Sequence, residues 1–176
     1  MLAPDLIIVE AFVPNCEKLF AALTGGIAWD ERMRARKTAS FGASHNYSGI
    51  EYAAVPMHEL LVPLVEQLES RLKFRPNNCP LNFHESGDAT MGFHSDATDE
   101  LAPGTGVAIV SLGAQRNITF QSKPDKAIER SYLLESGLLL YMSAEVQDKW
   151  KHAILKQESV GGRISLTFRQ MERKAP

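Results

Sequence analysis

Apolar residues recur at three- and four-residue spacing over 56–72, which predicts a helix with one apolar face. Pro63 lies inside this helix and should kink it or restart it. A second helix is predicted over 16–23, because Asn15 is a suitable N-cap and Gly25 and Gly26 would end it.

The segment between the two helices is polar and rich in glycine and serine, which indicates a loop. The apolar run Leu6–Val9, with Ala11–Val13 after it, predicts one short strand that ends at Pro14. We therefore expect residues 1–75 to form a mainly helical region with this strand and an intervening loop.

From residue 79 the pattern changes to short apolar runs separated by Gly, Asp, Asn and Pro. These runs predict strands at 80–85, 90–94, 106–112, 116–121, 130–135, 137–143, 150–155 and 163–170. Many short strands at this spacing are typical of a sandwich or barrel, so residues 79–171 are predicted to form a β jelly roll on which the helices pack. No linker or internal repeat interrupts the pattern, and a chain of 176 residues is most simply one domain, 1–176.

Composition narrows the class of protein. The formal net charge is -2, so binding to nucleic acid would have to depend on a local cationic patch. Cys16 and Cys79 lack the paired spacing of a structural zinc site. The chain has no apolar run long enough to span a membrane, and its start lacks the basic region of a signal peptide. We therefore expect a soluble, cytoplasmic protein without a membrane partner.

A His-x-Asp pair lies at the expected end of one of these strands. His94 and Asp96 are two residues apart, so on a strand and its continuation they point to the same face. His152 on a second strand completes a set of two imidazoles and one carboxylate, which holds Fe(II) while leaving coordination positions open. A His-x-Asp pair alone is common by chance, and zinc binds the same three ligands. Zinc hydrolases usually also need a nearby carboxylate base, and none is adjacent to His152 in the sequence.

The last predicted strand carries an arginine at each end of one face. Arg163 and Arg169 are six residues apart, with Ser165 and Thr167 between them on that face. If the face lies inside the barrel, the two buried cations need anionic partners, and a guanidinium binds a carboxylate in a two-pronged fashion. Such a pair suits a dicarboxylic cosubstrate. The alternative is a solvated edge strand whose arginines point outward.

In this order and spacing, the motifs resemble the AlkB family of Fe(II)- and 2-oxoglutarate-dependent dioxygenases. The resemblance runs through Arg36–Gly42, Asn46–Gly49, Leu81–His84, Val110–Gly113, Gly137–Met142, Trp150–His152 and Arg163–Arg169. It implies a single AlkB-like domain that is mostly β with α: a double-stranded β-helix (jelly roll) supported by N-terminal helices. The implied cofactors are Fe(II), 2-oxoglutarate as cosubstrate, and dioxygen.

The resemblance also implies a role for individual residues. The iron ligands would be His94, Asp96 and His152, and the cosubstrate would be bound by Asn82, His84, Arg163, Ser165 and Arg169. Phe41 and Tyr47 fall in the family's mobile lid, where an aromatic ring can stack on a flipped base. Three positions depart from the family: it usually has Tyr where this chain has His84, often an acidic residue that contacts the base at Thr98, and often Asn at Ser165.

The implied activity is oxidative N-dealkylation of alkylated nucleobases in DNA or RNA. In that reaction 2-oxoglutarate becomes succinate and CO2, and the hydroxylated N-alkyl carbon leaves as an aldehyde. The cations Arg32, Arg34, Arg36 and Lys37 are placed where they can contact phosphates, although charge runs are usually solvated faces. The expected partner is nucleic acid, as a single strand or a flipped base, and the expected state is a monomer.

Two other functions remain open at this point. A hydroxylase or dealkylase of a small molecule or a protein side chain could use the same scaffold, because fold does not determine substrate. A non-catalytic binding module of the same shape is the third hypothesis, and the intact ligand set argues against it.

Overall fold

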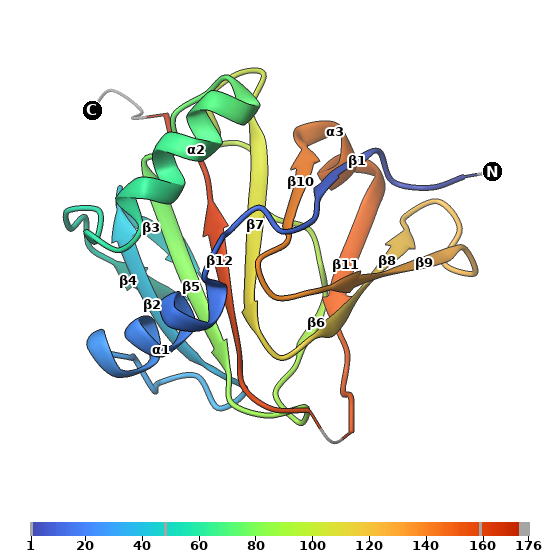
Figure 1. The fold of residues 1–176 in the computed structure, drawn as a ribbon. Helices are drawn as coiled ribbons and strands as arrows, with labels where there is room; N and C mark the ends of the chain where they lie inside the picture. Colours follow the sequence, from blue (N-terminus) through green and yellow to red (C-terminus); the bar gives the residue numbers. More distant parts are fainter. Residues whose placement is uncertain (1, 48, 159, 173–176) are drawn as a thin grey trace.

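The computed structural model describes residues 2–47, 49–158 and 160–172. The larger of its two facing sheets has six strands, in the order β1-β10-β7-β12-β5-β2 (Figure 1). Every neighbouring pair in this sheet is antiparallel. The bounds of the strands are β1 Leu6–Val9, β10 Leu139–Ser143, β7 Gly106–Gly113, β12 Arg163–Phe168, β5 Asn78–His84 and β2 Lys37–Gly42.

A second sheet faces the first and completes the jelly roll. Its order is β6-β11-β8-β9, with β6 Met91–His94, β11 Trp150–Ile154, β8 Arg116–Ser122 and β9 Glu129–Leu134. One hydrophobic core lies between the two sheets and contains Val107 and Leu140 from the larger sheet with Ile118 and Phe120 from the smaller. A separate two-stranded hairpin consists of β3 His45–Tyr47 and β4 Ile50–Tyr52.

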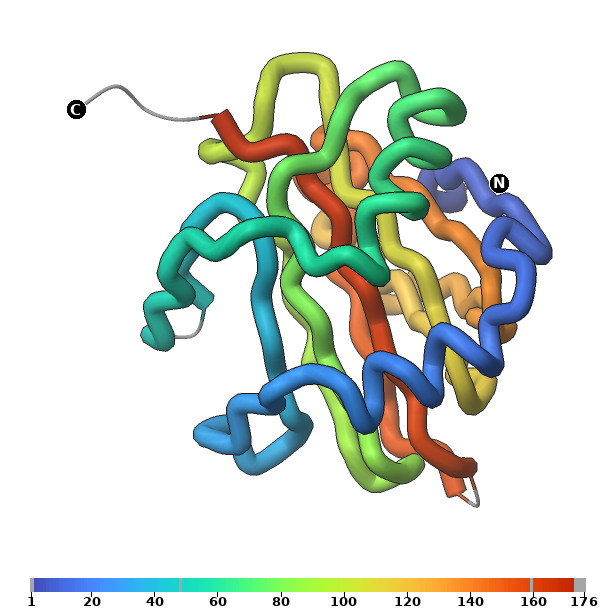
Figure 2. Tube along the Cα trace, turned by 60° about the vertical axis from the view of Figure 1, so that its left-hand side comes forward, coloured from blue at the N-terminus to red at the C-terminus, as the bar shows by residue number. Residues whose placement is uncertain are grey.

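Two helices cover the outer face of the six-stranded sheet, α1 Cys16–Gly26 and α2 Val62–Leu72 (Figure 2). Leu23, Leu64 and Leu68 from these helices form a second core with the sheet residues that face them. A short third helix, α3 Ala144–Lys149, connects β10 to β11. Within the described ranges, no helix has the length and apolar character needed to cross a membrane.

Alternation along β12 determines which face of the sheet is available for function. Ile164, Leu166 and Phe168 are fully buried in the core under the helices. Because successive side chains of a strand point to opposite faces, Arg163 and the other odd-numbered residues face the space between the sheets. β12 has a hydrogen-bonded neighbour on each side, β7 and β5, so it is an interior strand. The solvated edge strand considered above is therefore wrong.

The mostly-β jelly roll is confirmed, and all eight strands expected after residue 79 are present within a few residues of the expected bounds. The helix expected over 56–72 begins only at Val62 and follows Leu61, so Pro63 lies in its first turn. Proline is compatible with that position, since the first-turn amides have no partner within the helix. Residues 1–75 contain β1 to β4 as well as two helices, and the expected loop contains β2, which pairs with β5.

Candidate metal centre

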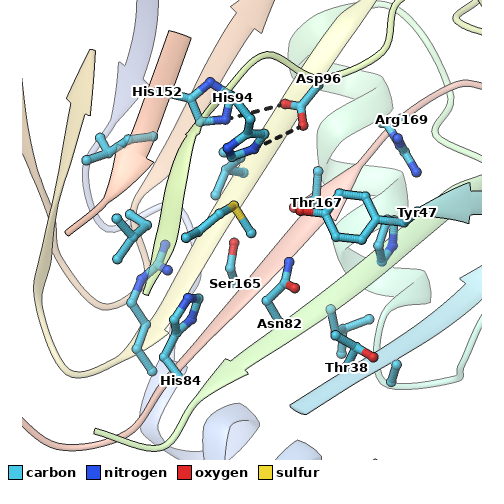
Figure 3. Close-up of a pocket in the computed structure, with 18 of the residues that line it drawn as sticks. Thr38, Tyr47, Asn82, His84, His94, Asp96, His152, Ser165, Thr167 and Arg169 are labelled. Carbon is cyan, nitrogen blue, oxygen red and sulfur yellow. Dashed lines mark ion pairs between the residues drawn. The ribbon is translucent and has the colours of Figure 1, made fainter. Parts of the chain in front are cut away.

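The two histidines and the aspartate of the expected ligand set meet in the structure. His94 ends β6, His152 lies on the adjacent strand β11 directly opposite it, and Asp96 follows β6. One ligand atom from each residue lies within 4.8 Å of the other two. Figure 3 shows the Asp96 carboxylate beside the two rings and facing both of them. Its Oδ1 lies 3.7 Å from His94 Nε2, and its Oδ2 lies 3.6 Å from His152 Nε2.

The environment orients the imidazole of His94 and favours the neutral form of His152. His94 Nδ1 lies 2.8 Å from the carbonyl oxygen of Gly92, and because a carbonyl only accepts, Nδ1 carries the proton and Nε2 is free for a metal. His152 is 4% exposed, and burial lowers its pKa to about 4, with Asp96 opposing and His94 reinforcing the shift. Two imidazole nitrogens and one carboxylate therefore suit Fe(II), with positions left for cosubstrate and dioxygen.

Gln147 on α3 holds the aspartate of this centre, and the sequence did not identify it. Its Oε1 accepts from the Asp96 backbone N–H at 2.9 Å, and its Nε2 donates to Asp96 Oδ2 at 3.3 Å. Ser95 Oγ donates to the Trp150 carbonyl at 2.8 Å and attaches the same segment to β11. These bonds orient the carboxylate toward the two histidines.

We expect Gln147→Leu to weaken Fe(II) binding by about 10–100-fold, the usual effect of removing a group that orients a metal ligand. The leucine keeps the bulk of the buried side chain but cannot hold either the Asp96 amide or the carboxylate. Metal titration of the apoprotein measures the effect, with Gln121→Leu as the matched control because Gln121 pairs with Glu129 at the surface. Unchanged affinity in Gln147→Leu would mean that Gln147 only fills space.

A cavity extends from the metal centre along the inward face of β12 and β5. Arg163, Ser165 and Thr167 contribute from β12, and Asn82 and His84 contribute from β5. The pairing of these strands explains the grouping, because Arg163 lies opposite His84 and Ser165 opposite Asn82. The structure thus brings all five expected cosubstrate residues, Asn82, His84, Arg163, Ser165 and Arg169, to one cavity with the three ligands (Figure 3).

The end of the cavity at Arg163 has buried polar atoms without partners. Arg163 is 1% exposed and donates from Nη2 to Ser111 Oγ at 2.9 Å. Within the described part of the chain, Arg163 Nε and both ring nitrogens of His84 have no hydrogen-bond partner. Burial, reinforced by Arg116, lowers the pKa of Arg163 to about 9. A buried cation beside unsatisfied donors fits a carboxylate ligand, so this end suits the far carboxylate of 2-oxoglutarate.

Hydrogen bonds also orient two side chains in the middle of the cavity, those of Arg169 and Asn82. Arg169 donates from Nε and Nη2 to Asn78 Oδ1 at 2.9 and 2.7 Å, which holds its guanidinium at the cavity wall near Asp96. Arg36 Nε donates to Asn82 Oδ1 at 2.7 Å. Because Oδ1 of Asn82 is engaged by Arg36, the amide has its Nδ2 donor left for a ligand in the cavity.

The two lid residues expected from the sequence have different positions. Tyr47 on β3 lines the cavity, and its hydroxyl accepts from Arg36 Nη2 at 2.9 Å. Phe41 on β2 packs edge-on against His58, 5.1 Å between ring centroids, and lines a separate hollow on the outer side of β2. Thr98 lies in the loop after the metal ligands and does not line the cavity.

The four cations expected to contact phosphate do not form one exposed patch. Arg36 is turned inward and 8% exposed. Arg32 pairs with Asp30, and Lys37 pairs with Glu31 and Glu85. Arg34 is exposed. The local positive charge available to a polyanion is therefore smaller than the sequence indicated.

The β3–β4 hairpin supplies an aromatic wall that the sequence only partly revealed. His45 stacks on Tyr52 with ring centroids 5.0 Å apart and planes at 8°, and both line the cavity with Tyr47. The Tyr52 hydroxyl lies 2.6 Å from Thr38 Oγ1, which connects the hairpin to β2. The sequence signal for this hairpin is the placement of ring side chains on both sides of Gly49, with His45 and Tyr47 before it and Tyr52 after it.

Comparison with known proteins places these features in a family. A model of the 2OG-Fe(II) oxygenase superfamily matches residues 19–169. "DNA oxidative demethylase ALKBH2" of Mus musculus is 30% identical over 153 residues, with 77% of this chain and 62% of that protein covered. The Homo sapiens protein of the same name is 28% identical over 147 residues, with coverage of 77% and 56%. The uncharacterized protein R406 of Acanthamoeba polyphaga mimivirus is 32% identical over 130 residues, with coverage of 73% and 67%.

A solved structure of OsALKBH1 shows the same fold. It superposes with a TM-score of 0.67 over 97% of this chain and all of that chain, at 18% sequence identity. The chain spans 62% of the mouse relative and 56% of the human relative.

Proposed function

The chain belongs to the 2OG-Fe(II) oxygenase superfamily, as an AlkB-like member, and from this premise we propose that it performs oxidative N-dealkylation of alkylated nucleobases in DNA or RNA. The observation that carries the proposal is the arrangement of the cavity. A His-His-Asp centre opens onto a wall of aromatic rings at one end and a buried arginine at the other. This arrangement provides a place for a metal, a dicarboxylate and a planar ring.

Each part of the cavity has a defined role in this reaction. His94, Asp96 and His152 hold the iron, which when bound supplies the oxidising chemistry that consumes dioxygen and 2-oxoglutarate. Arg163 binds the far carboxylate of 2-oxoglutarate, with His84 and Ser165 beside it. Asn82 donates from Nδ2, in the orientation that Arg36 imposes. Arg169 lies near Asp96 and binds the keto-acid end or the edge of the substrate.

The aromatic hairpin orients the substrate. Tyr47 offers a ring face to a base that has left its stack, and such stacking is tolerant of sequence. The products of one turnover are the dealkylated base, an aldehyde, succinate and CO2.

The direct test is turnover of 2-oxoglutarate by the protein loaded with Fe(II) under argon and then exposed to air. We expect succinate and formaldehyde to form with a single-stranded oligonucleotide that carries an N-methylated base, and not with the same oligonucleotide unmodified. Binding through phosphates should weaken as salt increases. The dependence of affinity on salt concentration should be shallow, because Arg32 and Lys37 pair with carboxylates and Arg36 is buried. Succinate formation only with small N-methyl compounds or methylated peptides would overturn the nucleic-acid proposal.

One observation favours the alternative, a hydroxylase or dealkylase of a small molecule or protein side chain. Arg32 and Lys37 already pair with carboxylates, so they offer less charge to a polyanion. The same panel of substrates separates the two functions.

We also propose that the protein acts as a monomer in the cytoplasm. A complete ligand set and cosubstrate cavity within one chain support the monomer, and two free cysteines suit a reducing compartment.

A further inference from the structure

Only one carboxylate lines the cavity, counting the described residues, and it is Asp96. Its oxygens face His94 and His152, and Gln147 holds it in that position, so its charge serves the metal. Glu100 is close enough to influence the pKa of Arg169, but its side chain is exposed and does not line the cavity. Among the described residues, the cavity wall therefore offers a bound substrate no carboxylate other than that of Asp96.

Three guanidinium groups lie at or next to this cavity. Arg163 and Arg169 line it, and Arg36 donates to Asn82 and Tyr47, which line it. In the part of the chain that the structure describes, no ion pair with a carboxylate involves any of the three, whose side-chain hydrogen-bond partners are the neutral groups of Ser111, Asn78, Asn82 and Tyr47. One dicarboxylate cosubstrate balances part of this charge, and the metal adds positive charge of its own.

Burial is the main cause of a lowered pKa at two histidines of the cavity, and the guanidinium groups add to it. Burial, reinforced by Arg169, lowers the pKa of His45 to about 4. Burial, reinforced by Arg163, Arg36 and Arg116, lowers the pKa of His84 to about 2. A cationic ring is thus disfavoured at two separate points of the cavity wall.

The ring on which a base would stack already has a cationic neighbour. The guanidinium carbon of Arg36 lies 5.6 Å from the centroid of Tyr47. A positively charged base on the other face of Tyr47 would share the ring with Arg36 and would add a like charge nearby. A neutral base on that face gains the stacking contact without this cost.

We propose that this site takes neutral N-alkylated nucleobases and discriminates against the cationic ones. The inference rests on the proposed function, because it assumes that the substrate is a base. It concerns the charge of the alkylated ring, which the fold alone does not determine.

Two oligonucleotides that differ only at one base provide the test. One carries 3-methyluracil, which is neutral, and the other carries 3-methylcytosine, which is a cation near neutral pH and has nearly the same shape. We expect kcat/KM to be higher for 3-methyluracil by about tenfold or more, since like charges placed together in a desolvated site are strongly disfavoured. Equilibrium binding under argon, with Fe(II) and 2-oxoglutarate present, should show the same order without turnover.

A pair of variants tests whether charge causes the difference. Thr167 lies on the cavity face of β12 between Ser165 and Arg169 and is partly exposed (Figure 3). Thr167→Asp introduces a carboxylate there, and Thr167→Asn is its neutral match in size. We expect the ratio of neutral to cationic substrate to fall by about tenfold in Thr167→Asp relative to Thr167→Asn, because the new carboxylate attracts the cationic base.

The outcomes distinguish failure of this inference from failure of the proposed function on which it rests. Equal use of the two oligonucleotides, or preference for 3-methylcytosine, overturns the inference and leaves nucleic-acid dealkylation in place. Failure to bind or convert either oligonucleotide, with turnover of a small N-methyl compound, overturns both. The wild-type comparison remains decisive if the Thr167 variants do not fold. Identical ratios in folded Thr167→Asp and Thr167→Asn would show that charge is not the cause.

Discussion

His152→Ala is expected to abolish the conversion of 2-oxoglutarate to succinate and to weaken Fe(II) binding by more than about 100-fold. Loss of a residue that only orients a metal ligand usually weakens metal binding by about 10–100-fold, and this substitution removes a ligand itself. The substitution leaves His94 and Asp96, which are too few to hold the ion with the remaining positions open. Metal titration followed by a succinate assay measures both effects.

The loss of a buried ring must be separated from the loss of a ligand. The ring centroids of His152 and Phe120 are 5.7 Å apart, so replacing His152 by alanine also opens a space in the core. His152→Gln keeps most of the volume and should lose activity just as fully, with a melting temperature closer to that of the wild type. His58→Ala is the matched control, because His58 packs on Phe41 outside the metal centre and should keep full turnover. Normal iron content and turnover in His152→Ala would disprove the assignment.

Where the sequence indicated the direction of a side chain, that side chain lies on a regular strand. On β12 a period of two separates Ile164, Leu166 and Phe168 from the arginines, so the face of Arg163 follows from the pattern once β12 is known to be an interior strand of the larger sheet. His94 and His152 could be paired only as a hypothesis, because the sequence does not determine which strands are neighbours. The structure shows that β6 and β11 pair at these two residues.

The residues that the sequence missed act through contacts between distant segments. Gln147 reaches Asp96 across 51 positions, and Arg36 reaches Asn82 across 46, and no periodic pattern marks either pair. Arg36 was placed with the phosphate-binding cations because its neighbours in sequence are charged, yet its side chain points inward. β2 was expected to be loop because its own residues are polar, and pairing with β5 at the edge of the sheet makes it a strand.

Arg163→Met is expected to remove binding of 2-oxoglutarate while leaving the metal-loaded protein without cosubstrate as stable as the wild type or more stable. The guanidinium is buried, and among the described residues its one side-chain hydrogen bond goes to the neutral Ser111 hydroxyl, so its charge is costly until a carboxylate arrives. In the wild type, cosubstrate at 100 times its Kd should raise the free energy of unfolding by about 2.7 kcal/mol, and the variant should lack this increase. Denaturant unfolding of the metal-loaded protein under argon, with and without 2-oxoglutarate, measures both quantities.

Arg116→Met is the matched control, because Arg116 is the other fully buried arginine of the described chain and has the opposite role. It donates to the carbonyl oxygens of Ser86, Ala89 and Leu155 at 3.2, 2.9 and 2.7 Å and so connects the β5–β6 loop to the segment that follows β11. Its removal should lower the free energy of unfolding by about 3 kcal/mol or more, since hydrogen bonds from a charged group are the strong ones. The increase caused by 2-oxoglutarate should persist. If Arg163→Met instead lowered stability and kept the cosubstrate effect, Arg163 would be a structural residue like Arg116, and the cosubstrate would bind elsewhere.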